Sequence, residues 1–223
     1  MIPGPRRRER RRPWTRGAFV ALDFETTGLD LERDSVISFG LVPIDGGRVV
    51  LGGARYGTVA PVVEPSASSI AVHGLLPDTL TAAPPLSEVR EVLASSLERR
   101  FLVTWAGTIE AAFLSRILGG SRRRWLARTV DVRELAKALN RRGAAPGKGA
   151  IRGLEDTMAR FELPGERAHH AFDDALMTAE LFLAVTSKLS AHGFGSVRSL
   201  LRESRRGGIR SPWTTSSPAR SNT

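Results

Sequence analysis

The sequence predicts an α/β fold in which a mixed sheet is flanked by helices. Strand-like segments come first along the chain, and helices that alternate with short strands follow them, an order typical of this fold class. The 223 residues suffice for one such domain but not for two large ones, and a hydrophobic content of 41% is ordinary for a globular protein. We therefore expect one domain over residues 17–189, a basic disordered arm over residues 1–16, and a basic, mostly disordered tail over residues 190–223.

An antiparallel meander is predicted at the beginning of this domain. The apolar run at residues 19–22 starts a strand that ends at a threonine–glycine turn. Residues 35–44 and 48–51 predict two further strands, because the Asp-Gly-Gly sequence between them favours a tight turn. We expect the first of these strands to be central in the sheet.

Helices and short strands alternate after the meander. Apolar residues at helical spacing predict helices at residues 86–99, 109–118, 154–161 and 173–189, and another helix that ends at residue 139. Short strands are expected at residues 101–105 and 130–132. Glycine, proline and small residues predict loops at residues 61–65 and 141–149.

Two carboxylates follow the apolar start of the first strand. Side chains alternate between the faces of a strand, so Asp23 and Glu25 share one face and Phe24 points into the opposite layer. Two like charges side by side repel each other unless a cation lies between them. The pair therefore indicates a metal site at the end of a strand. The alternative is a strand end with solvated acids.

A histidine and an aspartate stand at the beginning of the last predicted helix. His169 precedes Asp174 by five residues, so a loop histidine is expected to lean over this acid. Asp173 and Asp174 cannot share a direction, because consecutive helical positions differ by ~100°. One of the two is therefore expected to cap the helix or to be exposed. Taken alone, this segment also fits a helix cap with a surface histidine.

Three segments of the chain, in this order and at suitable separations, resemble motifs of the DnaQ-like exonucleases. The segments are Asp23-x-Glu25-Thr26-Thr27-Gly28, Val72-His73-Gly74-Leu75 and Ala168-His169-x-Ala171-x-x-Asp174-Ala175. The resemblance covers roughly residues 19–189 and implies an RNase H-like mixed sheet, with an antiparallel meander plus parallel strands. It implies the histidine (DEDDh) branch of the family, because the tyrosine of the other branch would stand at His170 and the chain's only tyrosine is Tyr56.

The resemblance implies two-metal 3′→5′ hydrolysis by four acids and a histidine. Asp23 would bridge the two ions, Glu25 and Asp174 would complete the metal on the nucleophile side, and Glu110 would face the other metal. His169 would act as general base, a role that suits the histidine side chain, whose unperturbed pKa is ~6.5. Ligation by carboxylates alone fits two Mg²⁺ or Mn²⁺ ions rather than Zn²⁺.

The resemblance also implies contacts to the 3′-terminal nucleotide. Thr26, Leu29 and His73 match the family's positions around this nucleotide. Taken alone, His73 would be a histidine in a turn.

One motif departs from the family pattern. Relatives usually carry His-Asn-x-x-Phe-Asp before a helix, where this chain has Trp-Ala-Gly-Thr-Ile-Glu at residues 105–110. Glu110 keeps a carboxylate, but its extra methylene moves the charge outward by roughly one bond length, which affects strict Mg²⁺ geometry. The alternative is that Glu110 is an acid favoured by the dipole at a helix start. In that case Asp131 is the nearest downstream acid to test as the fourth ligand.

Positive charge is concentrated at the two ends of the chain. Residues 1–16 carry a net charge of +6 and residues 198–223 one of +5, whereas residues 17–197 net −1. Arginine-rich ends suit a polyanion such as nucleic acid, but the arginine bias is also expected of a GC-rich genome. Trp14 and Trp213 would be available to stack on bases, unless they are stray aromatics in disordered arms.

The sequence carries no disulfide and no sign of export. It contains no cysteine, which excludes disulfides and thiol catalysis. The apolar run at residues 19–22 is far too short for a signal peptide, and no stretch approaches membrane-spanning length. We expect a cytoplasmic protein with no membrane partner.

Together these features predict a metal-dependent 3′→5′ exonuclease that hydrolyses phosphodiester bonds at single-stranded DNA or RNA 3′ ends. Its partners would be nucleic acid and a DNA polymerase or repair complex. One alternative is a catalytically weakened nucleic-acid-binding or polymerase-associated module that retains the exonuclease fold. Another is a structural subunit that holds RNA with its basic arms.

Overall fold

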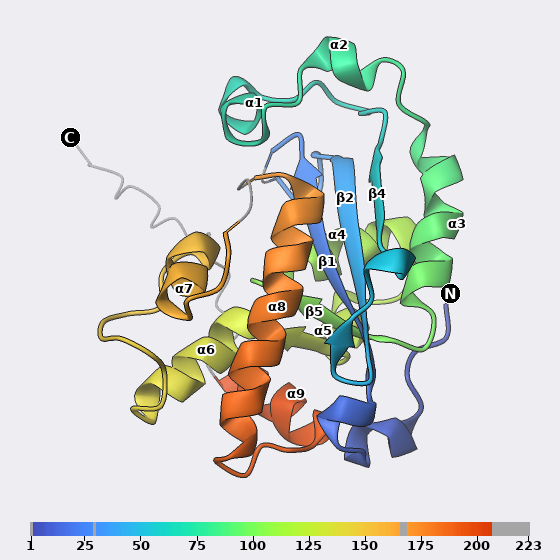
Figure 1. The fold of residues 1–223 in the computed structure, drawn as a ribbon. Coiled ribbons are helices and arrows are strands. Elements are labelled where there is room, and N and C mark those ends of the chain that lie inside the picture. The colour runs from blue at the N-terminus through green and yellow to red at the C-terminus, as the bar shows by residue number, and fades with distance from the viewer. Residues whose placement is uncertain (1, 29, 166–168, 207–223) are drawn as a thin grey trace, which may run out of the picture.

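The computed structural model describes residues 2–28, 30–165 and 169–206, and its centre is a mixed sheet of six strands (Figure 1). The strands are β1 (Ala18–Thr26), β2 (Val36–Asp45), β3 (Arg48–Val49), β4 (Arg55–Thr58), β5 (Phe101–Thr104) and β6 (Thr129–Asp131). Their order is β3-β2-β1-β5-β6, and β4 also pairs with β2. β1 is antiparallel to β2 and parallel to β5, which is parallel to β6. The predicted mixed sheet and its central first strand are confirmed.

The helices follow the predicted order, with some additions. They are α1 (Ala67–His73), α2 (Pro77–Leu80), α3 (Leu86–Leu97), α4 (Thr108–Leu118), α5 (Arg122–Leu126), α6 (Val132–Arg141), α7 (Leu154–Arg160), α8 (Ala171–Ser190) and α9 (Val197–Arg206), with short 3₁₀ helices η1 (Arg7–Arg11), η2 (Trp14–Arg16) and η3 (Leu51–Gly53). The predicted helices correspond to α3, α4, α6, α7 and α8, whereas β4, α1, α2, α5 and α9 are additions. None of the helices in the described ranges is long and apolar enough to span a membrane.

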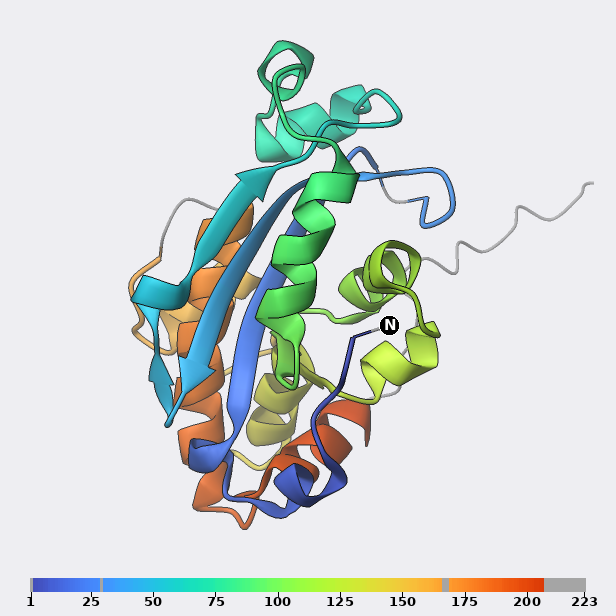
Figure 2. The same ribbon diagram turned by 90° about the vertical axis from the view of Figure 1, so that its right-hand side faces the viewer.

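Helices cover both faces of the sheet (Figure 2). One face packs on α6, α8 and α9, and the other packs on α3, α4 and α5. Side chains of β1 alternate between the two layers, with Phe19 and Ala21 in the first and Val20 and Leu22 in the second. None of the four is more than 1% exposed, so β1 is apolar at consecutive positions because both of its faces are buried.

The basic ends of the chain are folded where the structure describes them, which corrects the expected disorder. Trp14 is 8% exposed, its indole N–H donates to the Ser190 hydroxyl over 2.7 Å, and its ring meets the edge of Phe182. Val197 and Leu200 of α9 belong to the same core. A few apolar side chains among many arginines are enough to anchor both segments. Trp14 is therefore unavailable for stacking on bases, and Trp213 and residues 207–223 lie outside the described residues.

Candidate active site

A pocket of about 840 Å³ lies where β1 ends, against the N-terminal ends of α4 and α8 and against α1. We call it the acidic pocket. Among the residues that line it are Asp23, Glu25, Glu110, His169 and Asp174. All five predicted catalytic and metal-binding residues therefore face one space, although they come from three parts of the chain.

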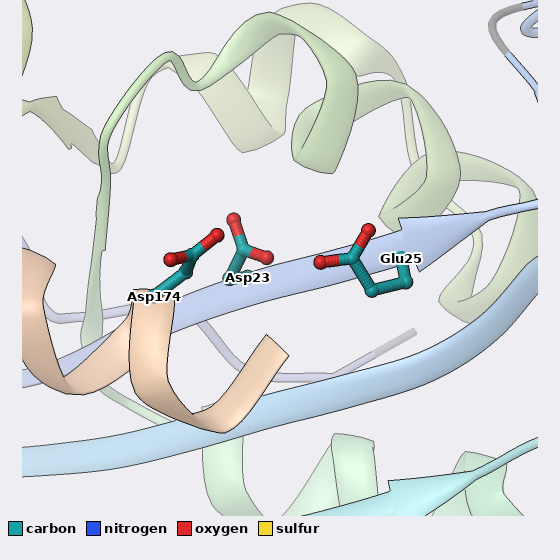
Figure 3. A group of neighbouring side chains, drawn as sticks. All are labelled: Asp23, Glu25 and Asp174. Carbon is teal, nitrogen blue, oxygen red and sulfur yellow. The ribbon is translucent and has the colours of Figure 1, made fainter. Parts of the chain in front are cut away.

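Three carboxylates meet in this pocket. Asp23 and Glu25 project from β1 and Asp174 projects from the first turn of α8 (Figure 3). One oxygen from each carboxylate lies within 4.8 Å of the others. Phe24, between the two strand acids, packs into the layer of α3 and α4. The predicted alternation of side chains along β1 is thus confirmed, with Asp23 and Glu25 on one face and Phe24 on the other.

A glycine lets α8 approach the strand acids. Gly40 of β2 is the partner of Asp23 in the β1–β2 register. A Cβ atom at Gly40 would lie 2.0 Å from the Ala171 carbonyl oxygen and 2.6 Å from the Phe172 Cα atom. The first turn of α8 therefore lies directly on the sheet at the level of Asp23, which brings Asp174 next to the strand pair.

Burial and mutual repulsion hold these carboxyl groups toward the protonated form. Burial, with the charges of Glu110, Glu25 and Asp174 adding to it, raises the pKa of Asp23 well above its usual range. Burial and the charge of Asp174 raise the pKa of Glu25 to about 7. Burial raises the pKa of Asp174 to about 6, although the nearby His169 opposes this shift. The ionised cluster is unfavourable without a cation.

Glu110 adds a fourth acid from the first turn of α4. Its side chain is 7% exposed, and its Oε2 atom is buried with no hydrogen-bond partner among the described residues. Burial, with some contribution from the charge of Asp131, raises the pKa of Glu110 to about 8. Glu110 is not one of the three carboxylates within 4.8 Å, but its charge acts on Asp23. Glu110 stands in the first turn of a helix, where the helix dipole favours an acid, but its side chain also lines the acidic pocket.

The acid set fits a divalent cation. Carboxylate oxygens are the ligands that hard ions such as Mg²⁺ and Mn²⁺ prefer. The three clustered carboxylates supply such oxygens, and the unpaired Oε2 atom of Glu110 is a buried acceptor with an unmet need for positive charge. The residues present therefore suit the metal dependence that the sequence predicts.

His169 and His170 occupy different environments. His169 is exposed at the edge of the acidic pocket, has a left-handed backbone (φ 60°), and its charge favours ionised Asp174. His170 stacks on Tyr56 with ring centroids 4.6 Å apart, and its Nδ1 atom lies 3.3 Å from an Asp173 carboxylate oxygen. Of the two consecutive acids, Asp174 therefore joins the acidic pocket and Asp173 meets His170.

A family model described as an exonuclease, RNase_T, matches residues 20–182. The chain belongs to the RNase_T exonuclease family. This places it among the hydrolytic exonucleases and confirms the predicted DnaQ-like membership. The matched segment begins within β1 and ends within α8, so it includes most of β1, the five other strands, and Asp23, Glu25, Glu110 and Asp174.

Curated relatives of this RNase_T exonuclease carry names of replication proteins. A DNA polymerase III subunit epsilon from Treponema pallidum is 29% identical over 170 residues, which cover 74% of each chain. A PolC-type DNA polymerase III from Thermotoga maritima is 31% identical over 180 residues, which cover 78% of this chain but only 12% of that protein. The chain thus spans about an eighth of the PolC-type relatives that it matches.

Solved structures share the fold. Escherichia coli Exonuclease I in complex with a dT13 oligonucleotide superposes with a TM-score of 0.68 at 16% identity, over 80% of this chain and 43% of that one. Cell-death related nuclease 4 superposes with a TM-score of 0.62 at 18% identity, over 80% of this chain and 65% of that one. These likenesses confirm the fold class.

A chain of hydrogen bonds fixes His73 on one wall of the acidic pocket of this RNase_T exonuclease. The His73 Nδ1 atom accepts from the Leu75 N–H over 2.9 Å, so Nε2 carries the proton and meets the Ser69 hydroxyl at 2.7 Å. Ser69 in turn donates to the Thr26 carbonyl over 2.6 Å. Thr26 and His73 are therefore linked through Ser69, and both His73 nitrogens are engaged. Their contact with a terminal nucleotide stays a prediction. Leu29 lies outside the described residues.

The structure shows the surroundings of the motif at residues 105–110, which the sequence does not predict. Trp105 follows β5 and lines the acidic pocket with Ile109. Asp131 caps α6, since its carboxylate accepts from the Glu134 N–H at 3.0 Å and from the Gly107 N–H at 3.3 Å. Asp131 thus holds the loop before α4 and does not line the pocket, which makes it a poor substitute for Glu110 as a metal ligand.

Proposed function

We propose that this RNase_T exonuclease removes nucleotides from single-stranded 3′ ends by a two-metal mechanism with His169 as general base. The observation that carries the proposal is the cluster of Asp23, Glu25 and Asp174 carboxylates within 4.8 Å. Glu110, whose Oε2 atom has no hydrogen-bond partner among the described residues, faces the same pocket. This acid set has no evident purpose without bound cations, because burial and repulsion oppose its ionisation.

The chemistry divides between the ions and the chain. Two divalent ions, when bound, supply a nucleophilic hydroxide and stabilise the leaving oxygen. Asp23, Glu25, Asp174 and Glu110 would hold the ions. His169 stands exposed at the edge of the pocket, where an imidazole nitrogen would accept the proton of the attacking water.

The walls of the acidic pocket would hold the terminal nucleotide. Thr26 and His73 are fixed through Ser69 on one wall, and Trp105 and Ile109 lie on the pocket lining as well. Aromatic and apolar side chains stack on bases of any sequence, which suits an exonuclease that must remove every nucleotide in turn.

Single-stranded DNA is the proposed substrate, and a DNA polymerase or repair complex is the proposed partner. The names of the curated relatives, DNA polymerase III epsilon and PolC-type polymerase, support this assignment, as does the oligonucleotide in the Exonuclease I structure. RNA contains the same phosphodiester bond at its 3′ end, so the assay below includes RNA as a second substrate. The cytoplasmic location stays a prediction.

A catalytically weakened module is the second candidate. The residues at 105–110 favour it, because Trp105 and Glu110 stand where relatives usually carry histidine and aspartate. Such a module would bind single strands without hydrolysing them.

One assay distinguishes the two candidates. Single-stranded DNA and RNA, labelled at the 5′ end, would be incubated with the protein and Mg²⁺, Mn²⁺ or a chelator. The exonuclease should give a ladder of products shortened from the 3′ end, with either metal and not with the chelator. Binding without hydrolysis under all conditions supports the weakened module, and shortening from the 5′ end contradicts both.

The matched histidine pair tests the general base. His169→Ala should lower kcat by about 100-fold or more, the usual range for general bases, and should flatten the rise of rate with pH. His170→Ala should lose far less, because His170 meets Tyr56 and Asp173 outside the acidic pocket. The reverse ranking would contradict the assignment of His169.

A further inference from the structure

Six arginines line a cleft of about 550 Å³ between η1 and α9. We call it the arginine cleft. Its lining residues are Arg7, Arg10, Arg11, Arg198, Arg202 and Arg205, together with Pro5 and Leu201. Figure 2 shows the N-terminal 3₁₀ segments beside α9 at the end of the molecule opposite α1. The arginine cleft is therefore a second site, distant from the acidic pocket.

The spacing of residues on α9 explains one wall of this cleft. Arg198, Arg202 and Arg205 follow one another at i, i+4 and i+7, so they lie on one face of the helix. The apolar positions Val197 and Leu200 are buried in the core and anchor the helix. The arginine face is thus held in place by packing on the other side of the same helix.

The acid of α9 is engaged away from the cleft lining. Glu203 is 3% exposed, and its carboxylate lies 3.1 Å from the guanidinium of Arg142 and 3.2 Å from that of Arg206. Arg141 approaches the same carboxylate at 3.8 Å. None of these arginines lines the arginine cleft. Glu203 therefore fastens α9 to α6 and leaves the positive charge of the cleft unbalanced.

No carboxylate within the described ranges pairs with the arginines of the cleft. Arg10 and Arg205 both donate to the Ala127 carbonyl oxygen, over 3.2 and 3.0 Å, and burial together with the charge of Arg10 lowers the pKa of Arg205. The nearby Glu9 accepts from the Arg6 backbone N–H at 2.6 Å. Residues 207–223 contain no aspartate or glutamate that could neutralise the cleft.

We propose that the arginine cleft binds the phosphate backbone of single-stranded nucleic acid, on the strand whose 3′ end lies in the acidic pocket. The inference rests on the proposed exonuclease function, which places the 3′ end of the strand in the acidic pocket. Guanidinium groups grip phosphates through paired hydrogen bonds and carry no base preference, which suits a strand of any sequence. An acidic peptide is less suitable, because Pro5 and Leu201 are the only apolar residues of the lining in the described part of the chain and offer no pocket for anchor side chains.

The distance between the two sites sets the strand length. Asp174 lies in the first turn of α8 and Ser190 is its last residue, so the helix rise places them about 24 Å apart. Ser190 does not line the arginine cleft, but it accepts the hydrogen bond of Trp14, which follows η1, so we take this length as the scale of the separation between the two sites. At roughly 3.4 Å per nucleotide, as along one strand of B-DNA, this is about seven nucleotides in a straight line. Longer substrates should therefore use both sites, and very short ones should use only the acidic pocket.

The test replaces the four cleft arginines whose side chains make no hydrogen bond to another described residue. The cleft variant combines Arg7→Gln, Arg11→Gln, Arg198→Gln and Arg202→Gln and leaves the bonds of Arg10 and Arg205 to Ala127 intact. The control variant removes the same charge at exposed positions elsewhere. It combines Arg48→Gln, Arg90→Gln, Arg123→Gln and Arg152→Gln. A third protein with lysine at the four cleft positions keeps the charge, and circular dichroism checks that each variant is folded.

Binding is measured first, with no hydrolysis. In EDTA, fluorescence anisotropy with labelled oligothymidylate or oligouridylate of about thirty nucleotides should give a Kd that is about 10-fold or more higher for the cleft variant. The logarithm of the binding constant falls linearly with the logarithm of the salt concentration, and each phosphate-binding arginine contributes about 0.7 to the steepness of this line for a single strand. The steepness should therefore fall by up to about 2.8 when all four arginines are replaced. The control variant and the lysine variant should stay close to the wild type.

Hydrolysis then separates the two sites. With Mg²⁺, the cleft variant should show a raised KM for the long strand, an unchanged kcat, and an unchanged KM for oligothymidylate of about four nucleotides. Equal Kd values for the cleft variant, the control and the wild type would overturn the proposal. So would loss of binding to a glutamate-rich peptide with long-strand binding unchanged. If the long strand binds through the cleft but no metal supports hydrolysis, the cleft stands and the proposed exonuclease activity fails.

Discussion

At the scale of single residues, Glu110 decides between an active enzyme and a binding module. It supplies the carboxylate at a position where an aspartate is usual, and its side chain is buried with one oxygen unpaired. The sequence predicts the carboxylate and its helix-start position. Its burial depends on how α4 docks beside β1, which no local pattern encodes. The same holds for the bonds from His73 through Ser69 to Thr26, since Ser69 and Thr26 are 43 positions apart.

Replacing Glu110 should reveal its role. Glu110→Gln should lower kcat by at least about 100-fold, because an amide brings no negative charge to a divalent ion. A residue that only supports a metal ligand usually costs about 10- to 100-fold when it is changed, so a larger loss indicates a ligand. Glu110→Asp should keep substantial activity or gain some. The measurement is the rate of 3′ shortening with Mg²⁺ and with Mn²⁺.

A matched control comes from another helix start. Glu88 is an exposed acid in the first turn of α3, so Glu88→Gln should leave the rate unchanged. If Glu110→Gln behaves like Glu88→Gln, Glu110 is no ligand. If the wild type is inert and only Glu110→Asp is active, the chain is the weakened module.

At the scale of helices and strands, the sequence predicts the long elements β1, β2, α3, α4 and α8 and several short ones, but it misses β4, α1, α2, α5 and α9. The apolar runs of β1 and β2 and the helical apolar spacing of α3, α4 and α8 are visible in the sequence. α9 is hidden among arginines, because only a few apolar side chains on one of its faces are buried. β4 has four residues and α1 has seven, too few to establish a period. The contact between α8 and β2 at Gly40 joins parts of the chain that are far apart, so the register of Asp174 against Asp23 required the structure.

Adding a side chain at Gly40 should disturb this contact. In Gly40→Ala the new Cβ would meet backbone atoms of Ala171 and Phe172, so the start of α8 must move away from the sheet. Overpacking of this kind costs about 1–3 kcal/mol, and a displacement of about 1 Å in a catalytic group can cost about 100-fold in rate. We expect a lower Tm and a large loss of kcat.

Gly52→Ala is the matched control, because no atom of the described residues lies within 4 Å of a Cβ atom at that position. It should preserve both Tm and kcat. Unchanged activity in Gly40→Ala would show that Asp174 need not be held at its present distance from Asp23.

At the scale of the whole molecule, opposite charges occupy opposite ends of α8. Asp23, Glu25, Glu110 and Asp174 line the pocket at its beginning. Six arginines line the cleft between η1 and α9, and α9 lies near the end of α8 (Figure 1). The acidic pocket is unfavourable when its carboxylates are ionised, so the fold stores repulsion that bound cations would relieve. This gives the site a thermodynamic signature that can be measured without substrate.

The stability of the metal-free protein should fall as pH rises. The pKa values of Glu25, about 7, and Glu110, about 8, lie above the ~4.3 of an unfolded glutamate, so the folded state binds more protons than the unfolded state between these limits. This contribution is fully present below about pH 4.3 and is lost as pH rises through about 7 to 8. Tm in EDTA should therefore decrease over this range, and Mg²⁺ or Mn²⁺ should restore it at pH 8 by binding only the folded state.

Neutral variants isolate the contribution of the acidic pocket. Glu110→Gln should raise Tm in EDTA at pH 8 by roughly 2–4 °C for each kcal/mol of repulsion removed, and should reduce the gain that Mg²⁺ gives to the wild type. Glu88→Gln should change neither quantity. Asp131, whose pKa burial raises to about 7, is present in all of these proteins, so the pH dependence that remains in Glu110→Gln includes its titration. A Tm that is equally sensitive to pH in wild type and Glu110→Gln, with no response to either metal, would mean that the four acids do not form a cation site.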